Sequence, residues 1–326
     1  MTQPSNETLL DIHNRMLRIR LFEERAGKLA EDGKIPGALH LYAGEEAVAG
    51  GVMVHLSDQD QITSTHRGHG HLVAKGGAFD KMYSELFGRV TGYCKGKGGS
   101  MHISNLDLGM LGANGIVGAG PPIAVGAAFS NKYRKTNNVA IAFFGDGASN
   151  EGAFHEAANL AAVLKLPIVF VCENNGYGEY TPQDKHQAIT DIADRAAGYG
   201  MPGVVVDGMD AIAVYEAAGE SIARARKGDG PTLLECKTYR FYDHSGVRGM
   251  GLSYRTAEEL ETWKKRDPIM QLEERLFEQG ILTQDDAEGL RVRIGEEIEA
   301  AVEFAETSPS PEVDTLLDDV YFVPAS

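Results

Sequence analysis

Apolar side chains recur at steps of three and four residues between positions 9 and 30, which is typical of an amphipathic helix. The residues on this stripe are Leu9, Ile12, Met16, Ile19, Phe22, Ala26 and Leu29. Gly33 follows the stripe, where glycine commonly ends a helix. We therefore predict an N-terminal helical arm over residues 1–35. Further helices are expected at 44–56 and 78–87, with a short strand at 61–65 between them.

The centre of the chain alternates short apolar runs with helical segments. The run at 139–144, of sequence VAIAFF, suits a strand that is buried on both faces of a parallel sheet, and 168–172 is a second such run. Further strands are expected at 204–206 and 232–237, and helices at 150–164 and 211–226. This alternation predicts an α/β fold with a doubly wound, mostly parallel sheet flanked by helices.

Two other regions have a different texture. Residues 88–120 are rich in glycine and have weak periodicity, and a long irregular stretch inside a compact domain is usually functional. We interpret this stretch as a binding segment. After Tyr254 the chain becomes charged, with helices predicted at 257–277 and 284–306, so a C-terminal helical extension is expected over 255–326. No internal repeat is visible, and we treat 1–326 as a single domain.

Composition excludes several classes of function. The 326 residues include 31 Lys+Arg and 47 Asp+Glu, for a net charge of −16, which argues against nucleic-acid and anionic-membrane partners. The polar N-terminus predicts no secretory signal, and no apolar stretch approaches the roughly 20 residues that span a bilayer. The three cysteines are scattered and form no CxxC pair, which disfavours a disulfide framework or a thiolate zinc site. A cytoplasmic protein is expected.

Polar residues follow two consecutive predicted strands. Gly145, Asp146 and Gly147 end the first strand, and Asn174 and Asn175 end the second. In open α/β sheets, ligands bind beyond the carboxyl ends of the strands. Carboxylate and amide oxygens suit Mg²⁺, which often shares its ligands with phosphates, and the N-terminus of the following helix favours a diphosphate at the same place. Either motif alone is also ordinary turn chemistry, so the pairing is the stronger signal.

With 26 residues (148–173) between them, the two motifs resemble the thiamine diphosphate-binding motif of thiamine-dependent enzymes. Further segments, in family order from about residue 8 to 275, are similar to the alpha subunit of the E1 component of 2-oxo acid and acetoin dehydrogenase complexes. These segments are HLYAGEEA (40–47), THRGHG (65–70), KGKGGSMH (95–102), NGIVGA (114–119) and YRT (254–256). The resemblance implies the thiamine diphosphate-binding fold, with thiamine diphosphate and Mg²⁺ as cofactors.

The resemblance also implies roles for particular residues. Asp146 and Asn175 resemble the side-chain ligands of Mg²⁺, with the backbone carbonyl of Tyr177 as a third protein ligand. Arg67 resembles the arginine that grips the diphosphate, for which a planar guanidinium is well suited. The remaining cofactor-binding positions are Gly145, Gly147 and Ala148 at the diphosphate, Gly115 and Val117 at the aminopyrimidine ring, and His66 along the channel.

Several histidines are candidates for catalysis. His244 resembles a loop histidine that reaches both the diphosphate and the mouth of the active site, and we expect His40 and His69 to act with it. His66, His69 and His71 form an H-x-x-H-x-H cluster that superficially resembles a zinc site. No acidic partner is evident nearby, so we prefer to interpret the cluster as polar lining of the cofactor channel. For His40, a buried, hydrogen-bonded core histidine is an equal alternative.

The resemblance implies partners as well. The glutamate that contacts the pyrimidine ring in this family comes from a separate beta subunit, so an α2β2 heterotetramer with sites between the chains is expected. A lipoyl-bearing E2 acyltransferase would accept the two-carbon product. Ser245 stands where pyruvate-type mitochondrial relatives carry a phosphorylated serine, but nothing else in the sequence suggests such regulation.

The implied reaction is the oxidative cleavage of acetoin. Segments 35–46 and 64–71 look like the acetoin branch, whereas the loop at 242–249 departs from both branches, so oxidative decarboxylation of pyruvate or another 2-oxo acid stays open. A nicotinamide-dependent Rossmann oxidoreductase is a remote alternative because the turn at 145–150 lacks the GxGxxG pattern. A non-catalytic metal-binding or scaffold protein that uses the histidine cluster is the third possibility.

Overall fold

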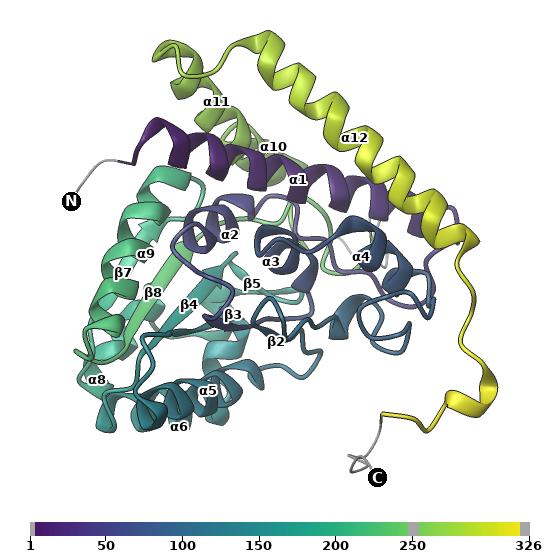
Figure 1. The fold of residues 1–326 in the computed structure, drawn as a ribbon. Helices are drawn as coiled ribbons and strands as arrows, with labels where there is room; N and C mark the ends of the chain where they lie inside the picture. Colours follow the sequence, from purple (N-terminus) through teal and green to yellow (C-terminus); the bar gives the residue numbers. More distant parts are fainter. Residues whose placement is uncertain (1–3, 247–253, 320–326) are drawn as a thin grey trace.

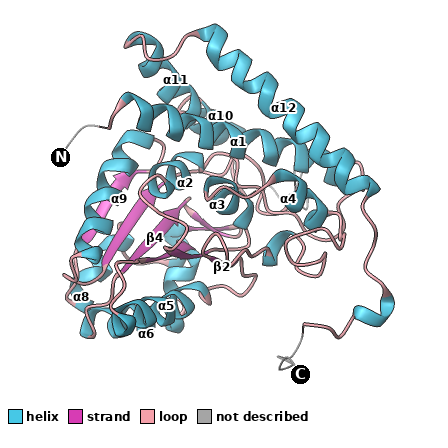
Figure 2. Ribbon diagram, viewed as in Figure 1, coloured by secondary structure: helices cyan, strands magenta, loops and turns pink. Residues whose placement is uncertain are grey.

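A parallel β-sheet lies at the centre of the molecule, with helices on both faces (Figures 1 and 2). The computed structural model describes residues 4–246 and 254–319. Six strands pair in the order β2-β1-β3-β4-β8-β7, and every pairing in this sheet is parallel. The strands are β1 (Gln61–Thr63), β2 (Met110–Gly112), β3 (Ala140–Gly145), β4 (Ile168–Asn174), β7 (Gly203–Asp207) and β8 (Thr232–Lys237). The expected doubly wound α/β fold is confirmed.

Helices cover the sheet in two layers. One layer contains α2 (Glu46–Met53), α3 (Gly68–Ala74), α4 (Phe79–Leu86) and α9 (Ala211–Arg226), and α1 (Asn6–Glu31) packs on the outer side of α2 and α3. The opposite layer contains α5 (Gly120–Arg134), α6 (Gly152–Val163) and α8 (Ala196–Tyr199). The C-terminal helices are α10 (Ala257–Lys264), α11 (Pro268–Glu278) and α12 (Gln284–Thr307), and α12 packs on α4 and α1 (Figure 1). No helix within the described ranges is long and apolar enough to cross a membrane.

The two layers enclose two separate hydrophobic cores because successive strand side chains point to opposite faces of a sheet. In β3, Ile141 and Phe143 join the core under α1, α2 and α9, whereas Ala142 and Phe144 join the core under α5 and α6. All of these side chains are buried. The unbroken apolar run that predicted this strand therefore reflects burial on both faces.

A short hairpin and a helical turn extend the fold beyond β4. Strands β5 (Tyr177–Gly178) and β6 (Thr181–Pro182) pair antiparallel, and α7 (Gln183–His186) follows them. The register of the main sheet places Gly145 opposite Glu173. The polar residues that follow β3 and β4 therefore emerge side by side at the carboxyl edge of the sheet.

The structure corrects several expected elements. The helix predicted at 257–277 is two helices, because Pro268 begins α11 and Asp267 caps it. The helix predicted from residue 44 begins at Glu46. Residues 88–120 contain the short strand β2 and the 3₁₀ turn η1 (Ser100–His102), and α5 begins at Gly120. The expected third helix, first central strand and α9 are present close to their predicted ranges.

A single buried carboxylate organises the glycine-rich stretch. Glu85, at the end of α4, accepts hydrogen bonds from the backbone N–H groups of Cys94, Gly96, Gly98 and Gly99, at 2.8 to 3.0 Å. Four donors on one carboxylate fix the loop without regular secondary structure. The weak periodicity of this segment therefore reflects a loop whose backbone is ordered by hydrogen bonds to the side chain of Glu85.

Candidate functional site

A cavity of about 510 Å³ opens at the carboxyl ends of β1, β3 and β4. Most of the predicted site residues line it. These are His40, His66, Arg67, Gly115, Val117, Gly145, Asp146, Gly147, Ala148, Asn175, Tyr177 and His244. They come from six segments of the chain that are far apart in sequence, and the crossovers of the parallel sheet bring them together. The cavity lies where a doubly wound sheet is expected to bind its ligand.

The two strand ends present buried oxygen atoms to this cavity. Asp146 and Asn175 are 1% and 9% exposed. Oδ2 of Asp146 and Oδ1 of Asn175 have no hydrogen-bond partner among the residues that the structure describes. Buried polar atoms are almost always paired, so two unpaired oxygens at neighbouring strand ends call for a ligand. A carboxylate and an amide oxygen fit a hard divalent cation such as Mg²⁺.

His186 and Tyr177 also line the cavity. Nε2 of His186, in α7, lies 3.3 Å from Oδ2 of Asp146 and is itself unpaired within the described ranges. Tyr177 lines the cavity, and its hydroxyl donates to Glu259 at 2.8 Å. The side chain of Tyr177 is therefore occupied elsewhere, and the role of its backbone carbonyl as a metal ligand stays a prediction.

The turn after β3 is shaped for a close approach of the backbone. Gly145, Asp146 and Gly147 lead into the 3₁₀ turn η2 (Gly147–Asn150), and α6 begins at Gly152. A Cβ atom on Gly147 would lie 3.1 Å from Cα of Gly178 in the neighbouring hairpin. Glycine at this position therefore lets the hairpin pack closely against the turn, and residues of both line the cavity.

Arg67 supplies a positive charge to one wall. Its side chain is buried, with Nη1 donating to the carbonyl of Leu41 at 2.8 Å and Nη2 donating to the carbonyl of His244 at 2.9 Å. Burial and the nearby guanidinium of Arg240 lower the pKa of Arg67 to about 10. Arg67 therefore remains charged at neutral pH and is held in place for an anionic ligand.

Glu45 and Glu173 lie buried on the same wall. Oε1 of Glu45 accepts a hydrogen bond from Nδ2 of Asn175 at 3.1 Å, and Oε2 of Glu45 lies 4.0 Å from Nε of Arg67. Glu173 accepts from the hydroxyl of Tyr42. Burial, and then the neighbouring charge of Glu173, raise the pKa of Glu45 to about 8. The wall behind the strand ends therefore holds two buried carboxyl groups, each with its own hydrogen-bond partner.

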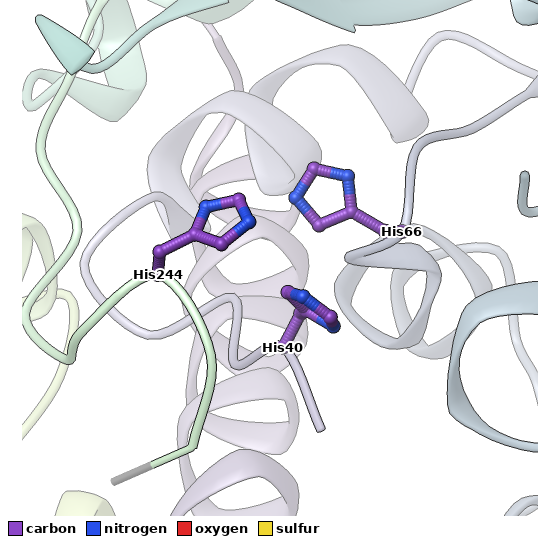
Figure 3. A group of neighbouring side chains, drawn as sticks. All are labelled: His40, His66 and His244. Carbon is purple, nitrogen blue, oxygen red and sulfur yellow. The ribbon is translucent and has the colours of Figure 1, made fainter. Parts of the chain in front are cut away.

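Three imidazole rings meet at another part of the cavity (Figure 3). His40, His66 and His244 each contribute one ring nitrogen to the cluster, and these three nitrogens all lie within 4.8 Å of one another. Nδ1 of His244 accepts from Nη1 of Arg240 at 3.0 Å. Burial, and then the charges of Arg67 and other cationic neighbours, lower the pKa of His40 and of His244 to about 3 and that of His66 well below its usual value. All three rings are therefore neutral at physiological pH.

Two other histidines lie in the core and are not part of the cavity lining. His69 does not line the cavity: it is fully buried, with Nδ1 3.1 Å from Oε2 of Glu23 and Nε2 3.0 Å from Oγ of Ser100. His71 is also fully buried, and Nε2 lies 2.9 Å from Oε1 of Glu173. Both histidines have the acidic partners that the sequence did not reveal. These contacts hold the ring of His69 in the core, and the catalytic role expected for it stays a prediction.

The remaining predicted positions lie at the rim or outside the described residues. Gly115 and Val117 line the cavity, and the side chains of Ile116 and Val117 are 70% and 54% exposed. Oγ of Ser245 is 3.5 Å from the carbonyl of Leu39. The last part of the unusual loop, residues 247–249, lies outside the described ranges.

The cavity lining also contains titratable residues that the sequence did not assign to the site, among them Glu45, Glu173, His186 and Arg240. Glu45 lies inside the HLYAGEEA segment (40–47), and Glu173 directly precedes Asn174. The neighbouring motif residues could therefore have indicated that both glutamates lie at the site. His186 and Arg240 carry no local signal, because only the hairpin and the end of β8 bring them to the cavity.

Comparison with known proteins identifies similar chains. A model of the dehydrogenase E1 component family matches residues 14–314. The alpha subunit of acetoin:2,6-dichlorophenolindophenol oxidoreductase from Bacillus subtilis is 54% identical, covering 97% of this chain and 94% of the relative. Its counterpart from Cupriavidus necator is 50% identical, with the same coverage. The chloroplastic pyruvate dehydrogenase E1 component subunit alpha-3 from Arabidopsis thaliana is 42% identical, covering 98% of this chain and 76% of the relative.

Proposed function

This chain belongs to the dehydrogenase E1 component family, and we propose that it is the thiamine diphosphate-binding alpha subunit of an enzyme that cleaves acetoin oxidatively. The site supports the proposal through one observation above others. Two buried, unpaired oxygens, on Asp146 and Asn175, lie on neighbouring strand ends beside the charged Arg67. That combination of a hard-cation site and an anion site suits a Mg²⁺ ion and a diphosphate together.

Particular residues would hold each group. Asp146, Asn175 and the carbonyl of Tyr177 would bind Mg²⁺, and Arg67 would pair with the diphosphate. The backbone at Gly145, Gly147 and Ala148 would line the diphosphate seat, and Gly115 and Val117 would border the pyrimidine ring. When bound, thiamine diphosphate supplies a nucleophilic carbon and an electron sink next to the carbonyl of the substrate.

The three-histidine cluster of His40, His66 and His244 would bind the substrate. Neutral imidazoles can donate a hydrogen bond from one ring nitrogen and accept one at the other. Acetoin carries a hydroxyl and a carbonyl and no charge, so it matches such a surface. Because Nδ1 of His244 already accepts from Arg240, its Nε2 carries the proton and is a donor. The cluster would therefore orient acetoin and hold a proton at the reacting oxygen.

A 2-oxo acid substrate is the second candidate. Arg67 and Arg240 both approach His244, at 2.9 to 3.3 Å, and two guanidinium groups favour a carboxylate nearby. Pyruvate would use this charge, whereas acetoin would not. Relatives named for acetoin are 50 and 54% identical and one named for pyruvate is 42% identical, which favours acetoin.

The proposal includes partners. We propose an α2β2 assembly with a beta subunit that contributes to the site, a lipoyl-bearing E2 acyltransferase as the acceptor, and a cytoplasmic location. The apolar side chains of Ile116 and Val117 project from the cavity rim, which suits contact with a second chain.

The test is an activity measurement on three samples: this chain alone, the beta chain alone and the co-expressed pair. Each is assayed with acetoin and with pyruvate, with 2,6-dichlorophenolindophenol as the electron acceptor and thiamine diphosphate and Mg²⁺ present. We expect activity only from the co-expressed pair, with a higher kcat/KM for acetoin than for pyruvate. A higher kcat/KM for pyruvate would contradict the substrate, and full activity of this chain alone would contradict the shared site.

A further inference from the structure

A buried carboxyl group lies directly behind one of the proposed metal ligands. We propose that Glu45 is a positioning residue that fixes the side-chain amide of Asn175 with its oxygen turned toward the cavity. The inference rests on the proposed function, because the orientation of this amide matters only if Asn175 binds a metal ion.

The hydrogen bond between the two side chains defines the orientation. Glu45 is fully buried just before α2, and its Oε1 accepts from Nδ2 of Asn175 at 3.1 Å. A carboxyl oxygen that accepts must face the NH₂ end of the amide, so the oxygen end points away from Glu45. That oxygen, Oδ1, is buried and has no partner among the described residues. Oε2 of Glu45 has no hydrogen-bond partner there, and its nearest cation there is Nε of Arg67 at 4.0 Å. Oε2 can therefore carry the proton of the neutral acid, and Oε1 can accept in either protonation state.

An asparagine ligand needs such a device, whereas an aspartate does not. The two ends of a side-chain amide have nearly the same shape, and half a turn exchanges an oxygen for an NH₂ group. Mg²⁺ binds oxygen ligands, and the NH₂ group of a side-chain amide cannot take the place of an oxygen. Asp146 presents an oxygen whichever way its carboxylate turns. Only Asn175 therefore loses its function if its amide rotates.

The preceding residue provides a natural comparison. Asn174 also donates from Nδ2 to a buried carboxylate, Oε1 of Glu235, at 2.7 Å. Its Oδ1, however, accepts from the backbone N–H of Gly176 at 3.1 Å. The amide of Asn174 is thus engaged at both ends and belongs to the turn. The Asn175–Glu45 pair uses the same contact to leave one oxygen free.

The first experiment measures Mg²⁺ affinity by calorimetry on the co-expressed complex with excess thiamine diphosphate. Removing a group that orients a metal ligand commonly weakens metal binding about 10- to 100-fold. We expect Glu45→Met, which keeps the side-chain length, and Glu45→Ala, which truncates the side chain, each to weaken Mg²⁺ binding at least about tenfold. Glu45→Gln keeps an oxygen that accepts from Asn175 and should stay within about threefold of wild type.

Glu235→Met is the matched control. It removes the carboxylate behind Asn174 and should lower the melting temperature while Mg²⁺ affinity stays within about threefold of wild type. If Glu45→Met binds Mg²⁺ as tightly as wild type, or if Glu235→Met weakens Mg²⁺ binding as much as Glu45→Met does, Glu45 does not position Asn175. A wild-type complex that binds no Mg²⁺ with thiamine diphosphate would instead overturn the proposed function.

A double-mutant cycle separates positioning from general loosening of the strand end. Asn175→Asp supplies an oxygen in every orientation, and its new negative charge would be repelled by Glu45. In the Asn175→Asp background, Glu45→Met should therefore leave Mg²⁺ affinity unchanged or raise it. An equal loss of affinity in both backgrounds would show that Glu45 acts by supporting the fold, and would overturn the inference.

Discussion

At the scale of the residue, two buried oxygens on adjacent strand ends distinguish the site. Oδ2 of Asp146 and Oδ1 of Asn175 are buried and unpaired within the described ranges, at adjacent strand ends. Leaving a buried acceptor without a partner costs about 1–3 kcal/mol, which a bound cation would offset. His69 and His71 are the opposite case, because each ring nitrogen has a partner in the core. These two histidines therefore stabilise the fold, whereas the oxygens of Asp146 and Asn175 are available to a ligand.

Replacing the strand-end carboxylate should prevent cofactor retention. We expect Asp146→Ala, co-expressed with the beta chain, to lose its thiamine diphosphate on gel filtration in Mg²⁺ buffer, because Asn175 and a backbone carbonyl alone are a poor site for Mg²⁺. The bound cofactor can be measured after its oxidation to a fluorescent thiochrome. Asp184→Ala, which removes an exposed aspartate paired only with Lys185 among the described residues, should retain it. Equal retention by both variants would contradict the metal assignment.

The pH dependence of the three-histidine cluster is a second prediction. The pKa of His40 and His244 is about 3 in the folded chain, against an ordinary value of 6.5. Between these values the unfolded chain takes up protons that the folded chain does not, so stability rises with pH there. The contribution of these histidines is fully present above pH 6.5 and is lost as the pH falls toward 3.

The measurement is a ¹⁵N NMR titration of the selectively labelled, cofactor-free chain from pH 8 to pH 5. We expect the ring nitrogens of His40 and His244 to keep the chemical shifts of neutral imidazole throughout. A variant with His244→Asn should lose less of its free energy of unfolding than wild type over the same range. A midpoint near 6.5 for either ring would contradict the assigned environment.

At the scale of the element, local signals predicted some of the structure and long-range contacts determined the rest. Strand β3 was predictable because its apolar run reflects burial on two faces. Helix α3 was not, because its short sequence GHGHLVA is rich in glycine and histidine, and its burial against α1 and α2 forms the helix. The strand-end motif was readable because Asp146 and Asn175 are spaced by one helix and one strand. Glu45 and His186 were not, because their roles depend on tertiary contacts.

Breaking an ion pair between helices lowers the free energy of unfolding more when the pair is buried than when it is exposed. Arg20 of α1 pairs with the fully buried Glu46 of α2 at 2.6 Å and with Asp267, the N-cap of α11, at 2.7 Å. We expect Arg20→Ala to lower the free energy of unfolding by about 3–5 kcal/mol, because it leaves the buried carboxylate of Glu46 without its cationic partner. Arg25→Ala, which breaks a pair with Glu299 at the surface, should cost less than about 1 kcal/mol. Chemical denaturation measures both, and equal losses would contradict the ranking.

At the scale of the whole molecule, the sheet order explains why the site is built from distant segments. The order β2-β1-β3-β4-β8-β7 places β1, β3 and β4 next to one another, although about 100 residues separate β1 from β4 in the sequence. The alternation of strands and helices was enough to predict a doubly wound sheet. It could not predict which helices form which layer, or that Glu85 shapes the glycine-rich loop, because those depend on side chains that meet only in the fold.

The central claim, that this sheet edge binds thiamine diphosphate through a divalent cation, is tested on the whole complex. The most direct measurement is calorimetric titration of thiamine diphosphate into the cofactor-free α–β complex, with Mg²⁺ and with the metal removed by a chelator. If this claim is right, thiamine diphosphate binds saturably in the presence of Mg²⁺, with one equivalent per alpha chain, and at least tenfold more weakly (about 1.4 kcal/mol) without Mg²⁺. Equal affinity in both conditions, or binding of NAD in place of thiamine diphosphate, would contradict it.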